Sequence, residues 1–87
     1  MFYPGNSVRV YVAPGATDMR KSINGLSILV AEHLELDPLS GALFAFRNRK
    51  RDMVKVLYWD VNGFCLWHRR IERHRFAWPE TKGEDLS

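Results

Sequence analysis

The residues of this chain that could do chemistry are mostly cations, and they gather in its second half. Residues 47–75 hold nine Lys and Arg against three Asp and Glu, although the net charge of all 87 residues is only +3. Such a concentration indicates an anionic partner, and Lys and Arg bind nucleic-acid phosphates without regard to sequence. We predict nucleic-acid contacts from these residues: Arg47, Arg49, Lys50, Arg51, Lys55, Arg69, Arg70 and Arg73.

Four of these cations lie in one short loop, RNRKRD, over residues 47–52. We expect a mobile hairpin loop that straddles a phosphate backbone. The alternative is a charged loop that only discourages aggregation through a sheet edge. Arg20 and Lys21 are a second pair of candidates, because cations at the start of a helix oppose its dipole and so suggest a contact with phosphate or with a partner protein.

The remaining candidate cations alternate with aromatic residues on predicted strands. Lys55 would share a face with Trp59, and Trp67 would share a face with Arg69. A sheet face that mixes rings and cations suits single strands or bent DNA ends, through stacking and cation–π contacts. The alternative is that Trp59, Trp67 and Trp78 form the core of this small domain.

Catalysis and metal binding have little support in the sequence. Cys65 and His68 are three residues apart on a predicted strand and would point to opposite faces, and no CxxC, HxH or HExxH pattern is present. Asp18, Asp52 and Asp60 could hold Mg²⁺, but they occupy cap and loop positions that structural Asp favours. We therefore predict no enzyme activity, no cofactor and no metal site, with a small Mg²⁺-dependent nuclease as a remote alternative.

The first half of the chain predicts a strand and a helix. Alternating valines predict a strand over Ser7–Ala13 that buries one face. A helix would begin at a cap formed by Thr17 or Asp18 and end near Leu36, since the residue before Pro38 is pushed out of the helical region. Its core-facing stripe, at spacings of three and four, would be Met19, Ile23, Leu26, Val30 and Leu34.

The second half predicts strands over Leu43–Arg47, Met53–Trp59 and Phe64–Ile71. The second hairpin would close through a tight turn over Asp60-Val61-Asn62-Gly63, in which Asn62-Gly63 is the strongest hairpin signal. An extended piece over Arg75–Trp78 and a disordered acidic tail over residues 80–87 would follow. We predict one α+β domain over residues 1–79. Its order is β-α-β-β-β, with the helix on a mostly antiparallel sheet of the N-terminal strand and three to four further strands.

One cysteine excludes an internal disulfide, which fits a reducing compartment. The N-terminus does not have the pattern of a signal peptide, and no apolar run approaches the ~20 residues that span a bilayer. We expect a cytoplasmic protein without a membrane partner.

A series of short motifs in fixed order resembles one known family. The motifs are Asp18-Met19-Arg20-Lys21, Asn24-Gly25-Leu26, Gly41-x-Leu43-Phe44-x-Phe46-x-Asn48-Arg49, Lys55-x-Leu57-Tyr58-Trp59-Asp60, Gly63-Phe64, Arg70-Ile71-Glu72 and Phe76-Ala77-Trp78-Pro79. They are similar to the small accessory protein of insertion-sequence-66 transposons, called TnpB or the second open reading frame, and not to the RNA-guided nuclease that shares the name. His68 and His74 depart from the family pattern, which commonly has Lys and Gly there.

The resemblance implies a mobile-element protein that works alongside a separate, larger transposase. The expected partners are DNA at the element ends, the transposase and other proteins of the same element. An adaptor that binds the transposase without touching DNA is the alternative function. The oligomeric state stays open.

Overall fold

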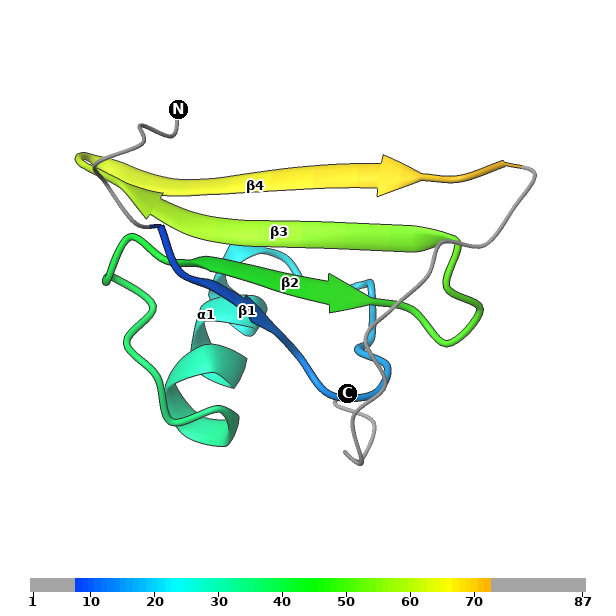
Figure 1. Cartoon of the computed structure of the whole chain (residues 1–87), viewed down its shortest axis with the longest axis horizontal. Coiled ribbons are helices and arrows are strands. Elements are labelled where there is room, and N and C mark those ends of the chain that lie inside the picture. Colours follow the sequence, from blue (N-terminus) through cyan, green and yellow to red (C-terminus); the bar gives the residue numbers. More distant parts are fainter. Residues whose placement is uncertain (1–7, 73–87) are drawn as a thin grey trace.

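Residues 8–72 form one helix against a four-stranded sheet (Figure 1). The computed structural model describes residues 8–72, so Arg73, the extended piece over Arg75–Trp78 and the acidic tail lie outside the described residues. The elements are β1 (Val10–Val12), α1 (Ile23–Ile28) with a π-helical continuation (Leu29–His33), β2 (Leu43–Arg47), β3 (Met53–Asp60) and β4 (Gly63–Arg70). The predicted α+β class and the β-α-β-β-β order are confirmed.

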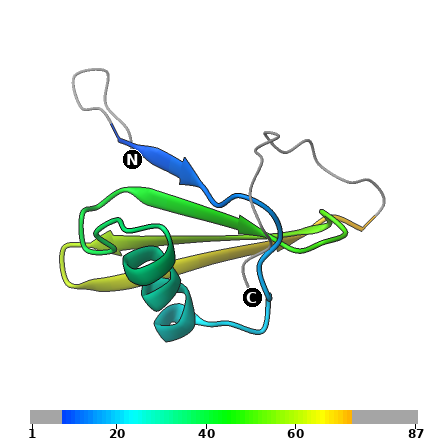
Figure 2. The ribbon, with the colours of Figure 1, turned by 90° about the horizontal axis from the view of Figure 1, so that it is seen from below.

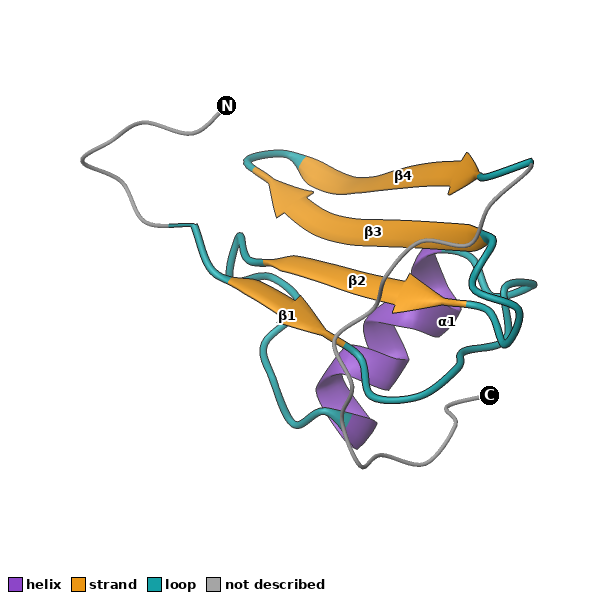
Figure 3. Cartoon of the chain, turned by 45° about the vertical axis from the view of Figure 1, so that its right-hand side comes forward, coloured by secondary structure: helices purple, strands orange, loops and turns teal. Residues whose placement is uncertain are grey.

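The strands lie side by side in the order in which they occur along the chain. β1 pairs with β2 in parallel, while β2–β3 and β3–β4 are antiparallel hairpins. A parallel pair needs a crossover connection, and α1 supplies it by packing on one face of the sheet (Figures 2 and 3). The opposite face carries no helix from residues 8–72.

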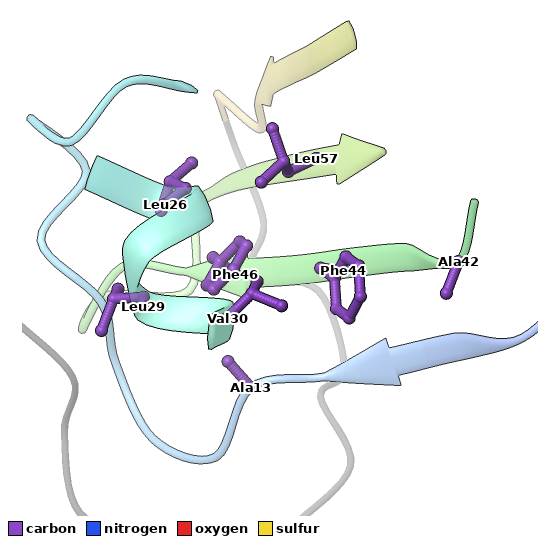
Figure 4. Close-up of a cluster of buried hydrophobic side chains, with 8 residues drawn as sticks. All are labelled: Ala13, Leu26, Leu29, Val30, Ala42, Phe44, Phe46 and Leu57. Atoms are coloured by element: carbon purple, nitrogen blue, oxygen red, sulfur yellow. The ribbon is translucent and has the colours of Figure 1, made fainter. Parts of the chain in front are cut away.

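The core lies between α1 and this sheet face, and phenylalanine fills its centre (Figure 4). Phe44 and Phe46 point inward from β2, and the register places Phe44 opposite Leu57 of β3. The helix contributes Leu26, Leu29 and Val30, so the predicted stripe is confirmed at its centre. The complete cluster is Ala13, Leu26, Leu29, Val30, Ala42, Phe44, Phe46 and Leu57.

The buried face of β1 is the one opposite to its valines. Parallel pairing sets Tyr11 beside Phe44, and their rings stack with centroids 5.6 Å apart. Ala13 continues this buried face, while Val10 is 59% exposed. The expectation that the valines face the core was wrong, because the register with β2 decides which face of a short strand is inward.

The helix begins four to five residues later than the predicted cap. Its N-cap is Ser22, without a side-chain cap hydrogen bond, and neither Thr17 nor Asp18 caps it. The cause lies on β3, where the buried Lys55 Nζ donates to the carbonyl oxygens of Met19 at 2.8 Å and Lys21 at 2.9 Å. A helix starting at Asp18 would need those carbonyls for its own hydrogen bonds.

The end of the helix and the following turn are close to the prediction. Leu34 N–H donates to Leu29 O at 3.1 Å, the i to i+5 spacing of a π-helix, and Glu35 then takes a left-handed φ of 54°. The Asp37 side chain accepts from Leu39 N–H, which closes the predicted turn before β2.

The predicted tight turn over Asp60-Val61-Asn62-Gly63 joins β3 and β4, but its central pair is not the Asn62-Gly63 pair that gave the hairpin signal. Asp60 pairs with Gly63, so the two turn residues are Val61 and Asn62, not Asn62 and Gly63. Val61 has a φ of 43° and is 82% exposed. A β-branched residue in this region is strained, because its branched side chain crowds the backbone.

We expect Lys55→Met to lower the free energy of unfolding by about 3 kcal/mol, because it removes two charge-assisted hydrogen bonds and leaves two carbonyls unpaired. Chemical denaturation measures this change. Lys50→Met makes the same substitution at an exposed position and should change stability by less than about 0.5 kcal/mol. Equal effects of the two substitutions would contradict the anchoring role of Lys55.

We expect Val61→Gly to raise the free energy of unfolding by about 1 kcal/mol, because glycine adopts a positive φ without strain and little packing is removed. Thermal melting measures the gain. Asn62→Gly is the control, since the φ of Asn62 is not positive and glycine there only adds backbone freedom to the unfolded chain. A lower melting temperature for Val61→Gly would count against strain at this turn.

Candidate nucleic-acid interface

Three segments that are distant in the sequence bring their cations to one end of the sheet (Figure 1). The loop after β1 reaches the end of β2, where Thr17 N–H donates to Arg47 O at 2.7 Å. The end of β4 reaches the β2–β3 loop, where Ile71 N–H donates to Asp52 O at 2.7 Å. We call this region the basic end, and its cations are Arg20, Lys21, Arg47, Arg49, Lys50, Arg51, Arg69 and Arg70.

Hydrogen bonds within the basic loop hold the conformation that the structure describes. Asn48 Oδ1 accepts from Asp52 N–H at 3.0 Å and Met53 N–H at 3.1 Å, and Asn48 Nδ2 donates to the Asp52 carboxylate. Arg51 closes the turn at a φ of 60°. Asn48 therefore holds the loop in shape, although the sequence pattern of cations did not single it out. The tendency of Asn to bond nearby backbone could have done so.

The loop and the end of β4 form one shallow surface. A hollow of about 300 Å³ is lined by Arg49, Lys50, Asp52 and Arg70, together with Asn48 and Met53. The hydrogen bond from Asn48, helped by the nearby charges of Arg70 and Lys50, lowers the pKa of Asp52. The Asp52 carboxylate thus helps to hold the loop in shape within a positive surface.

Arg20 and Asp18 form a two-pronged ion pair on the third segment. Arg20 Nη2 and Nε donate to the Asp18 carboxylate, at 2.8 Å for the shortest contact, and Arg20 N–H donates to the same group. These bonds lower the pKa of Asp18 to about 2. Lys21 lies against the helix, where its side chain would meet a Cβ added at Gly25 at 3.2 Å. The absence of a side chain at Gly25 therefore accommodates Lys21.

One predicted contact residue belongs to the interior. Lys55 is buried and its ammonium is bonded to two carbonyl oxygens, so it is not available to a phosphate. The prediction of Lys55 as a nucleic-acid contact was wrong, because its face of β3 is the one that α1 covers. Arg47 is half-buried, and its Nη1 donates to Asn48 O at 3.1 Å. Arg49, Lys50, Arg69 and Arg70 are exposed.

The tryptophans within residues 8–72 do not form the core. Trp59 is half-buried on the helix side, with its ring edge-to-face to Phe64 at 5.1 Å. Trp67 is 47% exposed on the opposite side of the sheet. Cys65 and His68 lie on opposite faces of β4, as predicted. The interpretation of these rings as core was therefore wrong, and Trp78 lies outside the described residues.

The three Asp of the nuclease alternative are not brought together. Asp52 and Asp60 lie at opposite ends of β3, and Asp18 is engaged by Arg20. Within residues 8–72 no group of three His, Cys, Asp or Glu side chains is placed to hold a metal ion. No helix in this part of the chain is long and apolar enough to cross a membrane.

Comparison with known proteins identifies the family. The family model described as "IS66 Orf2 like protein" matches residues 8–87. The chain belongs to this IS66 Orf2-like family. It is therefore a transposition-associated accessory protein of the insertion-sequence type that its motifs indicated.

Two proteins of Sinorhizobium fredii (strain NBRC 101917 / NGR234) are similar to this IS66 Orf2-like chain. One, named uncharacterized protein y4hO, is 45% identical over 83 residues, which are 95% of this chain and 72% of the relative. The other, uncharacterized protein y4jC, is 35% identical over 82 residues, covering 94% and 70%. No solved structure matches the chain at a significant level.

The Asp18–Arg20 pair predicts a specific pH dependence. Because the folded pKa of Asp18, about 2, lies below its ordinary value of 3.8, folding favours the ionised carboxylate. The stability that it contributes is present above pH 3.8 and is lost as the pH falls through about 2. A carboxyl NMR titration should give a midpoint near 2, and Arg20→Gln should raise it towards 3.8. Arg9→Gln, at the other end of the sheet, should leave the midpoint unchanged.

Proposed function

We propose that this protein is a non-enzymatic accessory of DNA transposition that contacts DNA through its basic end and assists the separate transposase of the element. The supporting observation is the convergence of eight Lys and Arg from three segments on one end of a small sheet. Asp18 and Asp52 interleave with these cations, and both are engaged in hydrogen bonds within this surface. Arg9, Asp37 and Asp60 lie at the other end of the sheet, so most of the Lys and Arg within residues 8–72 are at the basic end.

The shape of the basic end suits a phosphate backbone. Asn48 fixes the loop, so a charged surface is already formed before a ligand binds and less conformational entropy is lost on binding. Phosphate contacts of this kind are independent of base sequence and release counterions. The basic end would therefore supply affinity for DNA in general, and selection of the element ends would rest with the transposase.

We expect a variant carrying Arg49→Ala, Lys50→Ala and Arg51→Gly to bind duplex DNA more weakly than the parent protein. Glycine is chosen at residue 51 because the φ there is 60°. The slope of log K against log salt should become less steep by about one for each phosphate that the variant no longer neutralises. Fluorescence anisotropy across a salt series measures both quantities.

Arg9→Ala is the matched control for this experiment. Arg9 is exposed at the start of β1, at the end of the sheet opposite the basic end. Its removal takes away one charge without touching the proposed interface. An unchanged affinity of the triple variant, with a folded circular dichroism spectrum, would rule out contact through the loop. Co-purification with the transposase at salt high enough to remove DNA would instead favour the adaptor function.

A further inference from the structure

The face of the sheet that α1 does not cover has an unusual composition. The strand register assigns it these residues: Val10 and Val12 of β1, Leu43, Ala45 and Arg47 of β2, Val54, Val56, Tyr58 and Asp60 of β3, and Cys65, Trp67 and Arg69 of β4. We call this surface the open face. No element within residues 8–72 packs on it (Figure 2). Its strand residues include three charges: Arg47 and Arg69, which are positive and lie towards the basic end, and Asp60, which is negative and lies at the β3–β4 turn.

Two aromatic residues lie on the β3 and β4 part of the open face. Trp67 pairs with Val56 across β3 and β4, and Tyr58 pairs with Cys65, so Trp67 and Tyr58 are diagonal neighbours. The Trp67 side chain is 47% exposed. A groove of about 550 Å³ is lined by these two residues together with Val8, Gly41, Leu43, Val56, Trp59 and Asp60. The floor of the groove is therefore apolar and partly aromatic.

The charges near the two ends of the groove have opposite signs. Asp60 lines it at the end near the β3–β4 turn, where a phosphate would be repelled. Arg69 follows Trp67 by two residues on the same face of β4 and leads towards the basic end. An occupant with flat apolar groups and a negative backbone would lie with its flat groups over Trp67 and its backbone towards Arg69.

We infer that the open face binds single-stranded nucleic acid, with a base stacked on Trp67 and the adjoining phosphates at Arg69 and the basic end. Stacking on a tryptophan ring tolerates every base and requires that the base be unpaired, whereas a duplex hides its ring faces. A positive rim beside the ring adds affinity for the backbone. The inference rests on the proposed DNA contact. It adds that the bound nucleic acid is single-stranded and that Trp67 stacks on one of its bases.

The test compares two substitutions of the same ring. Trp67→Leu keeps apolar bulk but removes the ring, and should weaken binding of a labelled oligothymidine of about 12 nucleotides on the order of tenfold. Trp67→Phe keeps a stacking ring and should retain most of the affinity. Phe64→Leu is the control, because it removes a ring on the helix side of the sheet, where Phe64 packs against the core. Binding of a duplex of the same length, which the basic end would hold, should be unchanged in all three variants.

Direct evidence comes from a protein in which Trp59 and Trp78 are replaced by Phe, so that Trp67 is the single tryptophan. Its emission should be quenched when oligothymidine is added, and this measurement does not depend on the stability of Trp67→Leu. Unchanged emission on saturation with oligothymidine would overturn the inference.

The remaining outcomes separate the two proposals. An unaltered single-strand affinity in Trp67→Leu would overturn the open-face site, while duplex binding would leave the basic end in place. A failure of the parent protein to bind either DNA would end both proposals. A dimer that Trp67→Leu dissociates, seen by sedimentation with single-strand affinity unaltered, would make the open face a protein interface and would overturn the inference.

Discussion

The ammonium group of Lys55 determines how the first part of the chain meets the sheet. It lies on the helix-covered face of β3, where an isolated charge would be costly, and two backbone carbonyls from the loop before α1 compensate for its burial. Those bonds keep residues 19–21 out of the helix, so α1 begins only at Ile23. They also fix the loop that carries Arg20 and Lys21. An interior lysine, which makes no phosphate contact, thereby positions part of the charged surface.

The strands of the second half could be predicted from sequence, and the helix start could not. β2, β3 and β4 are recognisable because period-two alternation is a local property, and their predicted bounds agree within a residue or so. The start of α1 depends on Lys55, which is 34 and 36 residues away from the carbonyls that it engages. The inward face of β1 depends on its register with Phe44. Both errors arose from long-range pairing that no local pattern reports.

The candidate site shows the same division between local and long-range information. The basic loop was recognisable from composition, but its fixed shape depends on Asn48, whose bonds reach Asp52 and Met53. Lys55 differs from Arg69 in role only through the face on which each one lies. Alternation along β3 predicted that Lys55 and Trp59 share a face, yet it could not tell which face α1 would cover. Helix placement therefore explains why Lys55 is buried while Arg69 is exposed.

The different roles of phenylalanine and tryptophan follow from that placement. The space beneath the short helix is filled by Phe44, Phe46 and Leu57, all completely or almost completely buried. A half-exposed Trp67 contributes little to that core. An apolar surface left uncovered by residues 8–72 favours association with something else, since contiguous exposed patches on small domains usually mark interaction sites. Arg47 and Arg69 lie on this surface towards the basic end, while Asp60 lines the groove at the β3–β4 turn, so an anionic backbone would be directed towards the basic end. The two proposed contacts are then continuous, with the basic end holding the backbone of a strand and the open face holding a base that has left its duplex.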